Sequence, residues 1–158
     1  AMVRATHKAA PAAGRPVPAT NLHVTLAFLG SVPERRLGEL GEVARASAAS
    51  PASRLELAFD HLEYWQAARL LCALPAERPE AMAALARRLH DELAACGFAP
   101  DLKPFRPHVT VARKAHRAPR AMEMQPVTWS FVDLVLVDSR TLPEGAAYTV
   151  LEKFPLDQ

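Results

Sequence analysis

The sequence predicts an α+β fold with two lobes, in which two antiparallel sheets face a central cleft and helices pack outside them. Short runs that alternate apolar and polar residues are typical of strands, and two longer segments carry apolar residues at helical spacing. One short pattern also occurs twice, at residues 21–30 and 106–113, which indicates an internal duplication. We therefore expect one bilobal domain, residues 1–158, with one copy of the pattern in each half.

Helices are expected where apolar residues recur at helical spacing, and they span residues 3–13, about 34–48 and about 77–96. Gly14 stops the first of these helices. Ser31-Val-Pro-Glu34 is a capping box with proline in the first turn, and it opens the second. Gly97 is the residue expected just beyond the end of the third helix.

Strands are expected from the alternating and β-branched runs, and they span residues 21–29, 55–59, 69–74, 106–113, 127–137 and 147–154. Tyr64 and Trp65 lie in the connection between the second and the third of these strands. The run at 127–137 is either one long strand or a bent pair. The segments expected to be loops are residues 14–18, 50–53, 98–105 and 115–125.

Composition excludes several classes of protein. A formal net charge of +2 is too small to indicate non-specific binding to nucleic acid. No apolar run approaches the roughly 20 residues of a membrane span, and no secretory signal is present in the chain as given. Cys72 and Cys96 lie in apolar surroundings without a C-x-x-C spacing, so we expect reduced cysteines in a cytoplasmic protein.

The repeated pattern places a His and a Thr two residues apart in each copy. Because strand side chains alternate between faces, His23 and Thr25 point the same way, and so do His108 and Thr110. Their apolar neighbours point the opposite way, into a core; these are Leu22, Val24, Leu26, Val109 and Val111. The pattern therefore sets two imidazoles and two hydroxyls on exposed strand faces.

This combination is what metal-free hydrolysis or transfer of a phosphate ester requires. Histidine serves as acid or base near neutral pH, and threonine hydroxyls donate hydrogen bonds to phosphate oxygens, where charge builds up. Arg113 faces away from His108 by strict alternation, but at a strand end Arg113 or Lys114 can turn toward a phosphate, and the guanidinium fork favours Arg113. No metal-ligand motif is present, so we expect no cofactor.

With these residues, the chain resembles the two-histidine phosphoesterases, which carry paired HxTx motifs. His23-Val-Thr-Leu, His108-Val-Thr-Val, the flanking Phe28-Leu-Gly30 and Ala112-Arg113 match that pattern. The nearest group is the RNA 2′,3′-cyclic phosphodiesterases, also called 2′-5′ RNA ligase-like proteins. The resemblance extends through the segment that leads to the second motif and through the C-terminal strands, and so covers nearly the whole chain.

The resemblance implies a bilobal fold with its site between two antiparallel sheets, and hydrolysis of a terminal 2′,3′-cyclic phosphate to a 2′-phosphate. It assigns His23 as the proton donor to the leaving 3′-oxygen and His108 as the base that activates water. Thr25, Thr110 and Arg113 would hold the phosphate. Family members open with a further strand before the first helix, so this chain is expected to lack that strand. A monomer is expected, with an oligomer or strand exchange as the alternative.

Other residues and functions remain open at this point. Phe105 is a candidate for stacking on a base, whereas Phe28 is expected on the core face of its strand. The remaining histidines are expected to be structural or surface residues; they are His7, His61, His90 and His116. The partners expected are RNA ends or nucleotides with a cyclic phosphate, and no membrane. The alternatives are another cyclic phosphate, a 2′-5′ linkage (including ligation), or a non-catalytic module that binds RNA ends or nucleotides.

Overall fold

The computed structural model describes residues 14–49, 55–77, 79–101, 103–118, 123–142 and 145–156. The chain divides into two compact units, each assembled from three stretches of sequence. The first unit holds Ala1–Thr25, Glu56–Arg78 and Arg106–Trp129, and the second holds Leu26–Leu55, Pro79–Phe105 and Ser130–Gln158. The expected α+β class with two antiparallel sheets is confirmed. The expected helix at 3–13 and the break at 50–53 lie outside the described residues.

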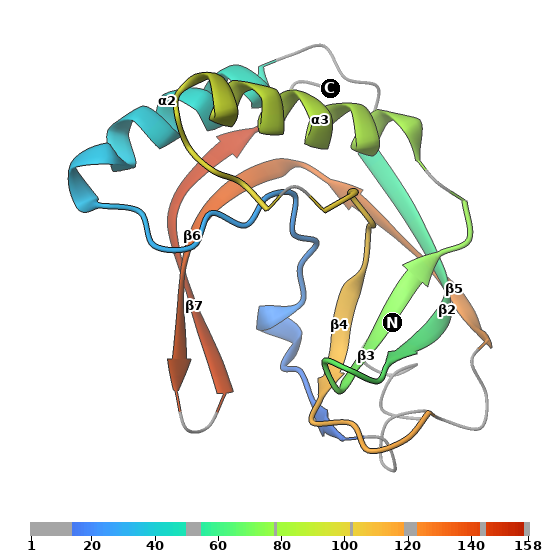
Figure 1. The fold of residues 1–158 in the computed structure, drawn as a ribbon. Helices are drawn as coiled ribbons and strands as arrows, with labels where there is room; N and C mark the ends of the chain where they lie inside the picture. Colours follow the sequence, from blue (N-terminus) through green and yellow to red (C-terminus); the bar gives the residue numbers. More distant parts are fainter. Residues whose placement is uncertain are drawn as a thin grey trace. The chain divides into compact units, whose positions relative to one another are not determined.

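The first unit is built on a five-stranded sheet, which we call sheet A (Figure 1). Its strands run in the order β1-β4-β3-β2-β5, and their bounds are Arg15–Pro16 (β1), Leu55–Trp65 (β2), Leu70–Pro75 (β3), Val109–Arg113 (β4) and Glu123–Phe131 (β5). The pairs β1–β4, β3–β4 and β2–β3 are antiparallel. Two expectations were wrong here: the segment 14–18 contains the short strand β1, and Tyr64 and Trp65 belong to β2 rather than to a connection.

Alternation of side chains explains why β2 and β4 form strands. Leu55, Leu57 and Phe59 of β2 are buried, whereas the residues between them are exposed. The ring of Phe59 packs edge-on against Trp129 of β5, with centroids 5.5 Å apart. Val109 and Val111 of β4 are buried as the alternation predicts. These apolar faces contribute side chains to the core, while backbone hydrogen bonds between neighbouring strands join them into one sheet.

The second unit combines two helices with a two-stranded sheet. Helix α2 spans Leu37–Ala48 and α3 spans Glu80–Ala95, while β6 (Asp133–Leu142) pairs antiparallel with β7 (Gly145–Pro155) (Figure 1). The run expected as one strand or a bent pair is therefore a bent pair, because the chain leaves β5 at Phe131 and enters β6 at Asp133. None of the described helices has the length and apolar character needed to cross a membrane.

The helices carry the core of the second unit. Leu40 and Val43 of α2 pack with Leu89 and Leu93 of α3 and with Phe98. Burial of each such large apolar side chain contributes about 1.5–3 kcal/mol. The buried residues of α3 recur at helical spacing; they are Met82, Leu85, Ala86, Leu89 and Leu93.

The sequence predicts the end of α3 correctly but not the start of α2. The capping box at Ser31 does not form: a 3₁₀ helix occupies Glu34–Arg36, neither it nor α2 has a side-chain cap hydrogen bond, and α2 begins at Leu37. At the end of α3, Gly97 has a φ of 72° and donates its N–H to the carbonyl of Ala94, while Phe98 donates to Leu93. This is a Schellman motif, which confirms the role predicted for Gly97.

Candidate active site

The second His-Thr motif lies at the start of β4. His108 immediately precedes the strand, and Thr110 is paired with Cys72 of β3, with its hydroxyl 3.9 Å from the Cys72 sulfur. His108 and Thr110 are both half-buried, whereas Val109 between them is fully buried. The motif therefore has the two-faced arrangement that the sequence predicts, although the strand begins at Val109 rather than at residue 106.

The first His-Thr motif does not lie in a strand. A 3₁₀ helix occupies Ala19–Asn21, and residues 22–25 follow it without regular secondary structure. The short strand β1 already occupies the edge of β4, and the 3₁₀ turn then redirects the chain before the motif begins. The backbone stays extended enough to keep the alternation, because His23 and Thr25 are exposed while Leu22 and Val24 are half-buried.

The alternation fails beyond Thr25. The chain bends at Leu26, and Phe28 emerges 63% exposed. The expectation that Phe28 faces the core was therefore wrong, because it assumed an unbroken strand through residue 29. Leu26 itself packs against the core of the second unit, as expected for an inward-facing residue.

The two motif histidines are held by the same hydrogen bond. Nδ1–H of His23 donates to the carbonyl of Asn21 at 2.8 Å, and Nδ1–H of His108 donates to the carbonyl of Arg106, also at 2.8 Å. A carbonyl oxygen only accepts, so each bond fixes a proton on Nδ1. The nitrogen that remains to gain or lose a proton is therefore Nε2 in both rings.

Both motif His-Thr pairs belong to the first compact unit, so the expectation of one copy in each lobe was wrong. β1 pairs with the end of β4, with Arg15 opposite Arg113 and Pro16 opposite Ala112, and Val17 donates its N–H to the carbonyl of Val111. The chain thus approaches the first motif running antiparallel to the strand that carries the second (Figure 1).

A β-bulge in β4 changes the direction of Arg113. Cys72 of β3 is paired with Thr110, but the next residue of β3, Leu71, is paired with Ala112, so Val111 is an extra residue. The burial of β4 shows the same shift, since Val111 and Ala112 are both buried. Arg113 is paired with Leu70, which shares a face with Cys72, and therefore lies on the face of Thr110. Strict alternation gives the opposite face, so that expectation was wrong.

Cys72 lies on the same face as Thr110, directly opposite it on the neighbouring strand β3. Burial raises the pKa of its thiol to about 11, against the smaller opposing effects of the Thr110 hydrogen bond and the charges of Arg113 and Arg106. The thiol is therefore neutral at physiological pH. Both described cysteines are free, as expected, with Cys72 buried and Cys96 half-buried.

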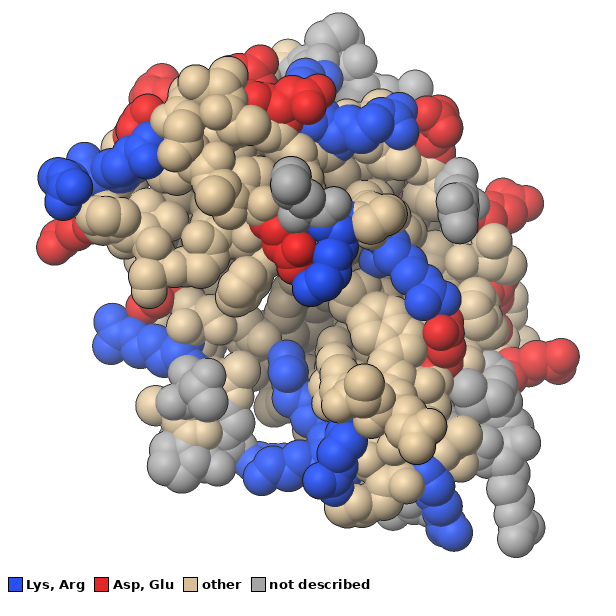
Figure 2. Space-filling view, in the orientation of Figure 1, with Lys and Arg blue, Asp and Glu red and all other residues tan. Residues whose placement is uncertain are grey.

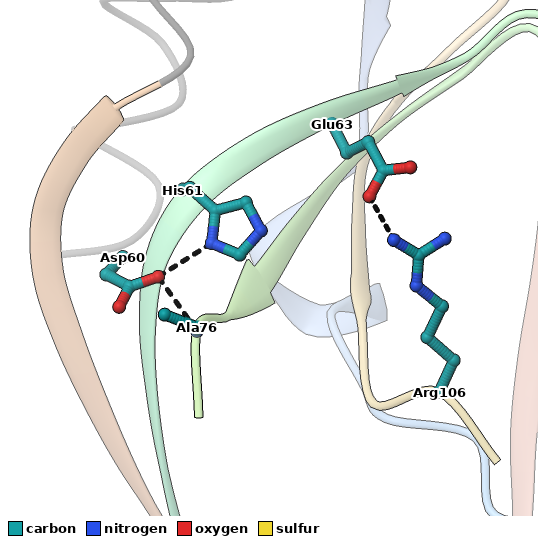
Figure 3. Close-up of polar contacts among 5 residues, drawn as sticks. All are labelled: Asp60, His61, Glu63, Ala76 and Arg106. Atoms are coloured by element: carbon teal, nitrogen blue, oxygen red, sulfur yellow. Dashed lines mark hydrogen bonds and ion pairs between the residues drawn. The ribbon is translucent and has the colours of Figure 1, made fainter. Parts of the chain in front are cut away.

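Trp65 packs against His108, a contact that sequence reasoning missed. The two ring centroids are 4.5 Å apart at an angle of 53°. The guanidinium of Arg106 lies 5.4 Å from the indole centroid and pairs with the carboxylate of Glu63 (Figure 3). Glu63 and Trp65 are two residues apart on β2 and share a face, which is the one signal in the sequence that links them.

Phe105 lies in the second unit, where it borders a shallow pocket with residues of α3, among them Ala86 and His90, and with Lys103 and Pro104. Its proposed stacking on a base remains a prediction. The other described histidines have structural partners: His61 bonds Asp60 (Figure 3), His90 donates to the carbonyl of Leu26, and His116 accepts from Arg69. Within the described residues, no three His, Cys, Asp or Glu side chains are grouped as metal ligands.

Comparison with known proteins finds a matching family and relatives that cover nearly the whole chain. Residues 4–142 match the family model described as the 2′-5′ RNA ligase superfamily. A protein of Escherichia coli K12 named RNA 2′,3′-cyclic phosphodiesterase is 33% identical over 98% of this chain and 86% of its own length. A protein of the same name from Thermus thermophilus is 34% identical over 99% of this chain and 83% of its own length.

Solved structures agree with these relatives. The crystal structure of E. coli LigT with 3′-AMP superposes with a TM-score of 0.85 at 28% identity, over 99% of this chain and 89% of that one. A Thermus thermophilus structure, TT0787, superposes with a TM-score of 0.80 at 30% identity, over 98% of this chain and 89% of that one.

Proposed function

The chain belongs to the 2′-5′ RNA ligase superfamily, and from this membership and its paired histidines we propose that it hydrolyses 2′,3′-cyclic phosphates at RNA ends or on nucleotides. The reaction proposed is metal-independent and gives a 2′-phosphate. His23 and His108 form its acid–base pair. The names of the relatives support the substrate, and the hydrogen bonds of the two histidines support the mechanism.

The observation that carries the proposal is the matched pair of Nδ1–H bonds to the carbonyls two residues earlier. Each bond fixes the tautomer and leaves Nε2 as the exchanging nitrogen, as a general acid or base requires. A module that only binds phosphate needs donors, but it needs no such control over which nitrogen carries the proton. The repetition of this bond at both motifs therefore favours catalysis over simple binding.

The proposed step conserves atoms and protons. Nε2 of neutral His108 accepts a proton from water as the water oxygen bonds to phosphorus, while Nε2–H of protonated His23 donates to the leaving 3′-oxygen as its bond to phosphorus breaks. The product keeps the phosphate on the 2′-oxygen. These roles follow from the resemblance, and they require the two rings on opposite sides of one phosphorus.

The non-bridging oxygens need donors because negative charge builds on them in the transition state. Thr25 and Thr110 each stand two residues after a motif histidine and supply hydroxyls. Arg113 supplies a guanidinium, and the bulge at Val111 places that side chain on the face of Thr110. Phe105 remains the proposed surface for stacking on a base.

Incubation with 2′,3′-cyclic AMP, with the product identified by chromatography or ³¹P NMR, tests this proposal. We expect 2′-AMP as the product, at a rate that EDTA does not change. His23→Ala and His108→Ala should each lower kcat by at least 10²-fold, the lower end of general acid–base effects, with unchanged melting temperatures. His61→Ala is the matched control, since its imidazole bonds Asp60 and takes no part in the mechanism.

Three outcomes would contradict the proposal. Formation of 3′-AMP would reverse the assigned acid and base, and loss of activity in EDTA would show a metal-dependent reaction. Binding of 2′-AMP without turnover of any cyclic phosphate would indicate a non-catalytic module. Ligation through a 2′-5′ linkage would use a 5′-hydroxyl in place of water as the group that attacks the same cyclic phosphate, and the family's name makes it the second candidate. Joining of RNA ends faster than hydrolysis would favour it.

A further inference from the structure

Strand β2 presents a carboxylate and an aromatic ring on the face that carries the second His-Thr motif. Glu63 is directly opposite Cys72 of β3, and Cys72 is directly opposite Thr110 of β4, so the three side chains form a row on one face of sheet A. Trp65, two residues after Glu63, shares that face and packs against the ring of His108. Neighbouring strands are about 4.8 Å apart, which places β2 roughly 10 Å from the motif strand.

Arg106 connects this carboxylate to His108 through both its backbone and its side chain. The carbonyl of Arg106 accepts Nδ1–H of His108 at 2.8 Å, and its guanidinium forms an ion pair with Glu63 (Figure 3). The same guanidinium lies 5.4 Å from the centroid of the Trp65 indole, which packs against the imidazole. These contacts form a closed circuit, in which Glu63 reaches His108 through Arg106.

The ion pair of Glu63 and Arg106 is unlike most ion pairs that the structure describes. It joins residues 43 apart in the sequence, one on β2 and one on the segment before β4. Most others join near neighbours, as Arg45 and Glu42 do on α2, and Figure 2 shows blue and red side chains next to one another where Figure 1 draws α2 and α3. With Arg106 56% and Glu63 34% exposed, the pair is expected to contribute little to stability, so its effect is expected at the motif instead.

The carboxylate of Glu63 alters the charge beside His108. Arg106 stays protonated at every ordinary pH, and a nearby cation disfavours the protonated form of an imidazole. Glu63 balances that cation, so the pair adds little net charge beside the ring. The other titratable or charged groups of this face or of the proposed mechanism stay unchanged when the pair is replaced; they are Cys72 with its neutral thiol, Arg113, His23, and His61 with its partner Asp60.

We propose that Glu63 is a positioning residue of the reaction, which holds the Arg106 guanidinium beside Trp65 and balances its charge near His108. This proposal rests on the proposed function, because it concerns the base of that reaction. It gives Glu63 two separable effects, one on the pH at which the base becomes active and one on the position of the imidazole. Both act through Arg106.

Replacing each member of the pair in turn tests the effect of charge. Glu63→Gln keeps an oxygen that accepts from Arg106 but leaves the cation unbalanced, so the acidic limb of kcat/KM for 2′,3′-cyclic AMP should move to lower pH by about half a pH unit. Arg106→Gln keeps the backbone carbonyl but leaves the carboxylate unbalanced, so the limb should move to higher pH by a similar amount. The double variant Glu63→Gln/Arg106→Gln removes both charges and should return the limb to near its wild-type position.

A second ion pair supplies the matched control for these variants. Asp138 and Arg140 pair on β6 in the second unit, with exposed fractions of 37% and 76%. Asp138→Asn and Arg140→Gln change the net charge as the test variants do. Neither should move the acidic limb, because neither charge adjoins the second motif.

Glu63→Ala tests the effect on position, because alanine offers no acceptor to Arg106. We expect kcat at the pH optimum to fall about tenfold with KM nearly unchanged, since displacement of a catalytic group lowers the rate. Glu63→Gln retains the contact and should keep kcat at the optimum close to the wild-type value. The melting temperatures of both variants should stay near that of the wild type, as expected for a partly exposed pair.

NMR gives a readout that needs no turnover. The indole that packs against His108 shifts the ring-proton signals of that imidazole through its ring current, and loss of these signals in His108→Ala identifies them. The signals should move toward those of an exposed histidine in Glu63→Ala and stay in place in Glu63→Gln.

Several outcomes would overturn the proposal. Shifts of the acidic limb in the same direction for Glu63→Gln and Arg106→Gln would show that charge balance does not set it, and an equal shift in Asp138→Asn would reduce the effect to net charge. A rise in KM with kcat unchanged would make Glu63 a substrate-binding residue. Unchanged His108 signals in Glu63→Ala would show that the indole needs no support from the pair. Absence of turnover in the wild type would refute the proposed function, and the NMR signals would still decide whether Glu63 positions His108.

Discussion

His108 is held both by a carbonyl and by an aromatic ring. The carbonyl of Arg106 fixes Nδ1, and the indole of Trp65 packs against the imidazole at 4.5 Å between centroids. The side chain of Arg106 approaches the same indole and pairs with Glu63. Arg106 therefore contacts both the imidazole, through its carbonyl, and the indole that packs against that imidazole, through its side chain. Because Trp65 packs against the ring of His108, it is a positioning residue in the proposed mechanism.

Replacing Trp65 should separate positioning from binding. Trp65→Ala is expected to lower kcat for cyclic AMP by roughly 10–100-fold, because a catalytic group displaced by about 1 Å loses activity on this scale. Trp65→Phe keeps an aromatic face and should recover most of the rate. Steady-state kinetics with melting temperatures checks this. A rise in KM with kcat unchanged would show instead that Trp65 binds the nucleotide.

Cys72 provides a pH-dependent contribution to stability. Burial raises the pKa of its thiol to about 11, above the ordinary value of 9.0. Between these values the unfolded chain loses the proton and the folded chain keeps it, so the free energy of unfolding falls as pH rises through this window. Urea unfolding from pH 8 to 11 should show a steeper fall for the wild type than for Cys72→Ala. Parallel curves for the two proteins would contradict the assignment.

At the scale of elements, the approach of β1 to β4 depends on Gly14. Its φ is 143°, and a Cβ there would lie 2.6 Å from the carbonyl oxygen of Arg113 and 2.8 Å from the nitrogen of Ala115. Both atoms belong to the backbone, so they cannot move aside as a flexible side chain can. The glycine therefore permits the pairing that leads the chain toward the first motif.

Gly14→Ala should destabilise the protein by about 1–3 kcal/mol, the range for strained backbone positions, and should lower activity because β1 is displaced from Arg113. Gly38→Ala is the matched control: its Cβ would meet nothing within 4 Å in α2, and alanine there should stabilise by up to about 1 kcal/mol. Urea unfolding and turnover of cyclic AMP measure both effects. Equal stability of Gly14→Ala and the wild type would refute the role given to this contact.

Local patterns predicted some elements well and others poorly. The Schellman end of α3 depends on Gly97 and its neighbours alone, so the sequence is sufficient for it. The bulge at Val111 depends on how β4 pairs with β3, about 40 residues away in the sequence, and no local pattern encodes that register. For the same reason, alternation along the sequence predicts the face on which Thr110 lies but gives the wrong face for Arg113, which follows the bulge. The capping box failed because Glu34, its last residue, begins a 3₁₀ helix after an extended Pro33.

At the scale of the whole molecule, the first unit draws on three separate stretches of sequence. A repeat of residue types singles out His23 and His108 as candidates without any knowledge of that assembly, because the proposed chemistry requires the same side chains at both motifs. The contact of Trp65 with His108 joins two of the stretches, and only the folded arrangement reveals it. The candidate histidines could therefore be proposed from sequence alone, whereas the aromatic contact of His108 could not.

The proposed mechanism also predicts how the two motif histidines depend on each other. If His23 and His108 act on the same phosphorus in one step, loss of either group should remove most of the benefit of the other. The double variant His23→Ala/His108→Ala should then be no more than a few-fold slower than the slower single variant, since residues that act as a unit are not additive. Comparison of kcat/KM for the two single variants and the double variant decides this. His61→Ala/His116→Ala is the control pair, and it should leave kcat/KM near the wild-type value. Effects that multiply in the double variant would show that the two histidines serve separate steps, and the single acid–base step proposed for this protein would then be wrong.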